Sequence, residues 1–260
     1  MFEFLIEVEE AEKIVKNFHE KVPQFGGLTC FGGVLTPSSW LHENGKPENI
    51  DPKSFLGFYF WFGLNENDEL TLYFETGLEY DPSNLPKEPT KEFLFTSSRM
   101  ITKEYLGSQD GFLIRGTRIA EEILSKNDFQ VSKREVIEAI RRFKEKFPKD
   151  SKGESFNKFP FGFYETNRFG DFSRFSNQSG LRSIGYLFAF DESKQVYIQT
   201  NRIRVVLIGI DINGNLLSNS NLGNLTQKFI ILQTSWPPPP SSTNPDFFDQ
   251  LKIQDESLEK

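Results

Sequence analysis

The chain is poor in the side chains that most metal sites and nucleophiles need. Its 260 residues include one cysteine, Cys30, and two histidines, His19 and His42. A structural zinc site takes four Cys or His ligands, so these three side chains are too few for one. A single cysteine also excludes a disulfide within these residues, and such scarcity is typical of the reducing cytoplasm.

Sequence motifs of the common catalytic folds are missing as well. There is no G-x-S-x-G elbow, no G-x-x-x-x-G-K-[ST] loop and no G-x-G-x-x-G after an expected strand. These absences argue against hydrolysis by a serine elbow, P-loop nucleotide chemistry and dinucleotide binding. A Cys-His pair is left open by composition, but Cys30 stands in an apolar strand pattern, where a buried, inert thiol is the usual outcome.

Long hydrophobic runs are also lacking. No apolar stretch approaches the ~18 residues that a membrane-spanning helix needs. The N-terminal sequence MFEFLIEVEEAEK has no basic region and turns acidic after six residues, unlike a secretory signal. We therefore expect a cytoplasmic protein with no membrane association.

Basic residues are in the minority, and the net charge is -7. Residues 1–100 carry 8 Lys and Arg against 17 Asp and Glu, and residues 183–260 carry 6 against 8. Only residues 101–182 have a basic surplus, with 16 against 12. An anionic partner is expected there first, although solvated helix faces are the simpler explanation of so small a surplus.

Phenylalanine, in contrast, is abundant, with 28 residues, and it predicts a Phe-rich core. Alternation in GFYFWFGLNENDELTLYFET, residues 57–76, predicts a β-hairpin. One face of this hairpin is apolar and is expected in the core: Phe58, Phe60, Phe62, Leu64, Leu70, Leu72 and Phe74. The other face is aromatic and partly polar: Tyr59, Trp61, Thr71, Tyr73 and Glu75.

Three amphipathic segments predict helices, at residues 8–22, 117–126 and 132–147. The last begins with the capping box SKRE, in which Ser132 is the N-cap and Glu135 follows three residues later. With the strand patterns LTCFGGVL and EFLFTSS, these segments predict an α+β fold. We expect an antiparallel sheet of β-hairpins covered by about three helices.

A second hairpin pattern repeats the first. IGYLFAFDESKQVYIQT, residues 184–200, aligns with LGFYFWFGLNENDELTLYFET, residues 56–76, through a glycine, alternating aromatics and an acidic turn. Internal duplication is one explanation. Independent convergence of two alternating hairpins is the other, and the sequence leaves both open.

The expected organisation is one domain over residues 1–236 and an extended tail. Residues 151–182 interleave Phe with Arg, Asn, Ser and Gly and predict a long loop, which in a compact domain is usually functional or mobile. PPPPSSTNP then predicts a stiff spacer, so residues 237–260 form a Pro-rich linker with an acidic end.

The first functional hypothesis is non-catalytic binding of a partner macromolecule, as part of a larger assembly. The aromatic rings of Tyr59, Trp61 and Tyr73 would form a binding face, and the loop would add Arg168, Phe172 and Arg174. Aromatic and arginine side chains are frequent anchors of protein interfaces. They also stack on and neutralise single-stranded nucleic acid, but the acidic first third of the chain disfavours that partner.

The alternative hypothesis is a Mg²⁺-dependent nuclease. Glu75, Glu79 and Asp81 follow one another closely, and two or three carboxylates can hold Mg²⁺ and activate water. Mg²⁺ is expected only under this alternative; the binding hypothesis needs no metal or cofactor.

Overall fold

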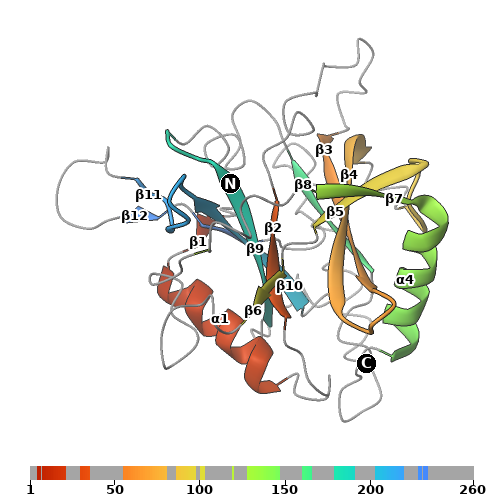
Figure 1. Ribbon diagram of the computed structural model, residues 1–260, viewed down its shortest axis with the longest axis horizontal. Coiled ribbons are helices and arrows are strands. Elements are labelled where there is room, and N and C mark those ends of the chain that lie inside the picture. Colours follow the sequence, from red (N-terminus) through yellow and green to blue (C-terminus); the bar gives the residue numbers. More distant parts are fainter. Residues whose placement is uncertain are drawn as a thin grey trace, which may run out of the picture.

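The computed structural model shows an α+β protein in which antiparallel sheets predominate (Figure 1). It describes these residues: 5–6, 8–21, 30–35, 55–80, 86–97, 100–102, 119, 128–146, 160–165, 179–190, 203–219, 228–229 and 231–233. The expected loop at 151–182 lies mostly outside them, and the tail at 237–260 lies wholly outside them.

The first large sheet has five strands and contains the expected Gly57–Thr76 hairpin. Its order is β7 (Asp128–Ser132), β5 (Phe93–Ser97), β4 (Leu70–Tyr80), β3 (Phe55–Leu64) and β8 (Phe161–Glu165). All neighbouring strands are antiparallel. The hairpin turns at Asn65, whose side-chain oxygen accepts hydrogen bonds from the backbone N–H groups of Asn67 and Glu69, both at 2.9 Å.

The second large sheet has six strands, also antiparallel. Its order is β1 (Leu5–Ile6), β13 (Ile231–Gln233), β10 (Ile203–Ile210), β9 (Ser183–Phe190), β2 (Cys30–Leu35) and β6 (Met100–Thr102). β11 (Ser218–Asn219) and β12 (Lys228–Phe229) form a separate short pair. The strands β9 and β10 are buried along their whole length, and both of their faces are largely apolar, with Ser183 and Arg204 as buried polar residues.

A phenylalanine-rich core joins the two large sheets. The predicted apolar face of β3 and β4 packs against the inner face of β9 and β10, so the described residues of that face are placed as expected. The rings of Phe60 and Phe62 meet edge to face at 5.6 Å, and those of Tyr186 and Phe188 do so at 5.7 Å. Such edge-to-face pairs are favourable for aromatic rings.

Each large sheet carries one helix on its outer face (Figure 1). α1 (Val8–Lys21) packs Ala11, Ile14 and Val15 against the six-stranded sheet, and α4 (Lys133–Lys146) packs on the five-stranded sheet. The order of layers is therefore helix, sheet, sheet, helix. Neither of these two described helices is long and apolar enough to cross a membrane.

Two of the three predicted helices are confirmed to within about one residue at each end. The capping box forms as expected: the Ser132 N–H donates to the Glu135 carboxylate at 3.0 Å, and the Glu135 N–H donates to Ser132 Oγ at 3.4 Å. The helix predicted at 117–126 lies outside the described residues except for Ile119, which is buried.

The two halves of the chain contribute the same series of elements. A strand, a helix and a strand (β1, α1, β2) precede β3, β4 and β5, and the same series (β7, α4, β8) precedes β9, β10 and β13. Each strand-helix-strand segment joins the sheet of the other half. The order β1-β13-β10-β9-β2 thus corresponds to β7-β5-β4-β3-β8, with β6 as an additional edge strand. The first arms of the two repeated sequences fall on the equivalent strands β3 and β9, while the predicted second arm at residues 196–200 lies outside the described residues. The matching order of the strands favours internal duplication.

Glycines let the exchanged strands pass close to aromatic rings. Gly162 of β8 pairs with Phe60, and a Cβ at Gly162 would lie 2.0 Å from the Phe60 ring. Gly33 of β2 pairs with Tyr186, and a Cβ there would lie 2.5 Å from the tyrosine hydroxyl. In both sheets the glycine has no side chain, so there is space for the aromatic ring of the residue with which it pairs.

Candidate functional site

The aromatic face proposed for binding lies inside the protein. Tyr59 is 3% exposed, Trp61 is fully buried and Tyr73 is 5% exposed. Their rings pack with Phe161 of β8, whose centroid is 5.1 Å from that of Trp61, and with three residues of α4: Val136, Ala139 and Ile140. A helix, not a ligand, covers this face, so the expectation of an open aromatic platform is corrected.

Glu75 lies on the same covered face and holds a neighbouring loop. Its carboxylate accepts a hydrogen bond from Trp61 Nε1 at 3.0 Å. It accepts three more, of 2.5 to 2.6 Å, from the Thr90 N–H, the Thr90 hydroxyl and the Lys91 N–H. The side chain is 1% exposed. Four donors therefore satisfy a buried acceptor, and they fix residues 90–91 against β4.

The remaining candidates for a Mg²⁺ site cannot be placed around Glu75. Glu79 belongs to β4, but its side chain is outside the described residues, as is the whole of Asp81. No group of three or more His, Cys, Asp or Glu within the described residues could hold a metal ion. The nuclease hypothesis stays a prediction from the sequence, and Glu75 already has a structural role.

The arginine and phenylalanine loop is not placed either. Arg168, Phe172 and Arg174 all lie outside the described residues. The structure therefore does not bring them together with Tyr59, Trp61 and Tyr73.

An open cleft of about 620 Å³ lies beside α4. It is bounded by α4, the turn between β3 and β4, and the strands β4, β5 and β7, all of which are on the right-hand side of Figure 1. These residues line it: Asn65, Glu66, Asn67, Glu69, Thr71, Tyr73, Thr96, Ser97, Phe129, Val131, Arg134, Glu135, Glu138 and Arg142. Of the side chains predicted to bind a partner, only Tyr73 borders this cleft.

Hydroxyl groups and an exposed phenylalanine line the sheet side of the cleft. Thr71 Oγ1 and Thr96 Oγ1 are 3.4 Å apart, and the Thr96 hydroxyl donates to the Leu72 carbonyl at 2.7 Å. Burial raises the pKa of Tyr73 from its ordinary value of 10 to about 12. Phe129, on the edge strand β7, is 48% exposed. The lining thus combines apolar surface with hydrogen-bonding groups.

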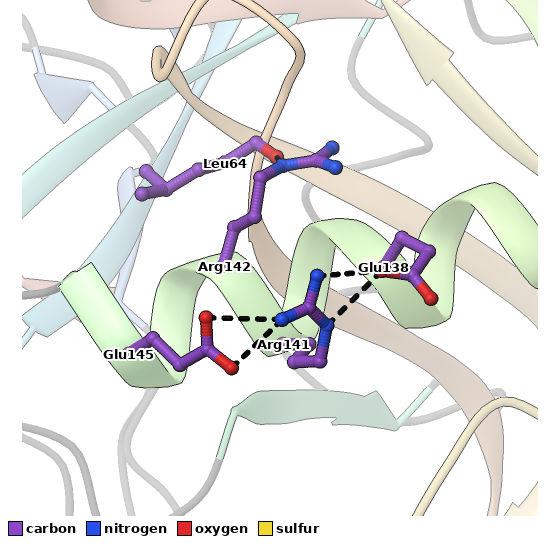
Figure 2. A network of polar contacts seen from close by, with 5 residues as sticks. All are labelled: Leu64, Glu138, Arg141, Arg142 and Glu145. Carbon is purple, nitrogen blue, oxygen red and sulfur yellow. Dashed lines mark hydrogen bonds and ion pairs between the residues drawn. The ribbon is translucent and has the colours of Figure 1, made fainter.

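Most carboxylates around the cleft are already hydrogen-bonded. Glu135 is bound within the capping box, and these bonds from Ser132 lower its pKa. Glu69 accepts from the Asn65 side chain at 2.9 Å. Glu138 accepts two hydrogen bonds from Arg141, which also bonds to Glu145, as Figure 2 shows. Glu66, in contrast, is exposed on the turn.

The two arginines that line the cleft retain free donors. Arg142 donates from Nε to the Leu64 carbonyl at 3.0 Å, and Figure 2 shows it extending from α4 toward that strand end, away from the Arg141 network. Within the described residues, its two terminal nitrogens have no hydrogen-bond partner, and the Arg134 guanidinium has none. The cleft therefore offers positively charged donors on its helix side.

Sequence comparisons give no family assignment. No family model, curated protein or solved structure matches this chain.

The cleft could hardly be predicted from the sequence. Arg134 and Arg142 are eight positions apart on one predicted helix, and this spacing places them on one side of it. What the spacing does not indicate is that this side borders strand β7 and the β3–β4 turn, which are distant along the chain. Phe129 was missed because it stands in the short segment DFQVS, which has no strong alternation.

Proposed function

We propose that this protein binds a polypeptide segment of a partner protein in the cleft between α4 and the five-stranded sheet. The observation that carries the proposal is the open cleft itself, with the half-exposed Phe129 on its edge strand. An exposed aromatic side chain beside hydrogen-bonding groups is typical of the anchors of protein interfaces. An edge strand adds backbone groups with which an extended peptide can pair.

The charges around the cleft favour a polypeptide over a nucleic acid. Four glutamates and two arginines line it: Glu66, Glu69, Glu135, Glu138, Arg134 and Arg142. A chain of phosphates would meet more negative than positive side chains, and phosphate neutralisation dominates nucleic-acid affinity. A peptide has local charges of either sign and can match such a mixed surface.

The test is selection of peptide ligands by the full-length chain. A library of displayed random dodecapeptides is panned on immobilised protein, and selected peptides are synthesised and titrated by fluorescence polarisation. We expect that Phe129→Glu abolishes binding, because it puts a charge where an apolar contact forms. Ile212→Glu is the matched control, since Ile212 is also an exposed apolar side chain, 76% exposed, but is not part of the cleft.

Thermal denaturation of both variants establishes that they are folded. If no peptide is selected, or if selected peptides bind Phe129→Glu as well as wild type, the proposal is wrong. A labelled single-stranded oligonucleotide is titrated in parallel. If the oligonucleotide binds wild type but not Phe129→Glu, and no peptide binds, the cleft is a nucleic-acid site and the proposal also fails.

A further inference from the structure

We propose that Arg142, supported by Arg134, binds an acidic side chain of the peptide held in the cleft. This inference rests on the proposed function and specifies the chemistry of its ligand. It combines three observations: a cleft of about 620 Å³, two arginines on its helix side, and hydrogen bonds that occupy most of the neighbouring carboxylates.

Arg142 is held in position before any ligand arrives. Its side chain is partly buried, and the bond from Nε to the Leu64 carbonyl at 3.0 Å restrains the guanidinium. A guanidinium is planar and its terminal N–H groups match the two oxygens of a carboxylate. Because the group is already oriented, less side-chain entropy is lost when a carboxylate binds.

The nearby carboxylates do not neutralise this arginine by direct pairing. Glu138 lies on the same helix and lines the same cleft, but Arg141 binds it through Nε at 3.0 Å and Nη2 at 2.9 Å. Glu135 is bound by Ser132, and Glu69 by Asn65. Neither arginine of the cleft makes an ion pair with a described residue.

A carboxylate is the ligand group that this arrangement selects. Arg134 and Arg142 provide donors and no acceptors, so they favour an anion. The glutamates at the rim, Glu66 above all, repel a ligand with several negative charges. A peptide with a single carboxylate can pair with the arginines, and it has too little negative charge to be strongly repelled by the glutamates.

The experiment uses peptides selected on the wild-type chain and synthesised with amidated C-termini, so that only side chains carry acidic groups. We expect the selected sequences to share an Asp or Glu. Replacing it with Asn or Gln weakens binding to wild type about tenfold or more, as expected for a charge-assisted hydrogen bond. On Arg142→Gln the acidic peptide and its amide form bind equally.

Lys144→Gln is the matched control, because it removes one positive charge from an exposed position of the same helix that does not line the cleft. It is expected to keep the preference for the acidic peptide. If peptides bind but share no acidic residue, or if Arg142→Gln keeps the full preference, this inference is wrong and the proposed function stands. If no peptide is selected, the proposed function fails and this inference fails with it.

Discussion

At the scale of single residues, Glu75 and His19 show how burial changes the meaning of a polar side chain. Each has one phenylalanine and one polar residue as its direct neighbours, Phe74 and Thr76 for Glu75, and Phe18 and Glu20 for His19, so the local sequence does not show whether either side chain is buried. In the folded protein Glu75 is enclosed between Trp61 and residues 90–91, and His19 is partly buried on α1. Candidate catalytic side chains read from a sequence are therefore also candidate structural ones.

Glu75→Gln is expected to destabilise the protein strongly. The amide group would present N–H donors to a site that already holds four donors, and each buried donor left unpaired costs about 1–3 kcal/mol. The midpoint of urea unfolding measures the change. Glu88→Gln is the control, since that exposed carboxylate only pairs with Lys133 at 3.0 Å and should contribute less than about 1 kcal/mol. Equal destabilisation by the two changes would contradict the structural role of the Glu75 carboxylate.

His19 is expected to make folding less stable in acid. Burial lowers its pKa from 6.5 to about 3, so the folded protein keeps it neutral while the unfolded chain binds a proton below about pH 6.5. The stability that neutral His19 provides is complete above pH 6.5 and decreases as the pH falls toward 3. One such group changes the free energy of unfolding by at most about 1.4 kcal/mol per pH unit.

The measurement is urea unfolding of wild type and His19→Gln between pH 7.5 and pH 4.5. The two curves are expected to converge as the pH falls, because only wild type has the extra protonation site in its unfolded state. The acidic side chains titrate in both proteins and cancel in the comparison. Parallel curves would show that His19 is accessible to protons in the folded protein.

At the scale of elements, β8 and β2 each join the sheet of the other half of the chain through a glycine that lies opposite an aromatic ring. The sequence pattern identified β2, β3, β4, β5 and β9, since alternation is a local property. It did not identify β8, which stands inside the expected loop at 151–182, because FGFYE is short and most of that segment has no periodicity. Tertiary pairing with β3 makes these five residues a strand.

Gly162→Ala is expected to loosen the pairing of β8 with β3. The new methyl group would overlap the Phe60 ring, and overpacking of this kind costs about 1–3 kcal/mol. The thermal midpoint should fall accordingly. The double variant Gly162→Ala with Phe60→Leu provides the control: the smaller side chain makes room, so the two changes together should cost less than the sum of each alone. Additive costs would mean that the ring and the glycine are not in contact.

At the scale of the whole molecule, each sheet is built by both halves of the chain. The strands β3, β4 and β5 take β7 and β8 from the second half, while β9, β10 and β13 take β1 and β2 from the first. The helices follow the same exchange, because α1 covers the sheet of β9 and α4 covers the sheet of β3. Neither half can bury its apolar faces without the other.

Two fragments, residues 1–110 and 111–260, are therefore expected to fold only together. Each fragment alone lacks the strands and the helix that complete its sheet, so its apolar surface stays exposed. Co-expression followed by affinity capture of one tagged fragment measures complex formation, and circular dichroism measures folding. A fragment that folds alone as a soluble monomer would contradict the interlocked arrangement. Tagged fragment 1–110 co-expressed with untagged fragment 1–110 is the control, and it measures non-specific association.

Local sequence patterns were sufficient to predict two helices with their ends, the hairpin at residues 57–76 and a core of phenylalanine. These follow from periodicity, capping and turn residues, which act over a few positions. That α4 covers Tyr59, Trp61 and Tyr73, and that Arg142 borders an open cleft beside β7, follows only from the packing of the folded chain. Alternation separates the two faces of a strand, but which element packs on each face depends on contacts between distant parts of the chain.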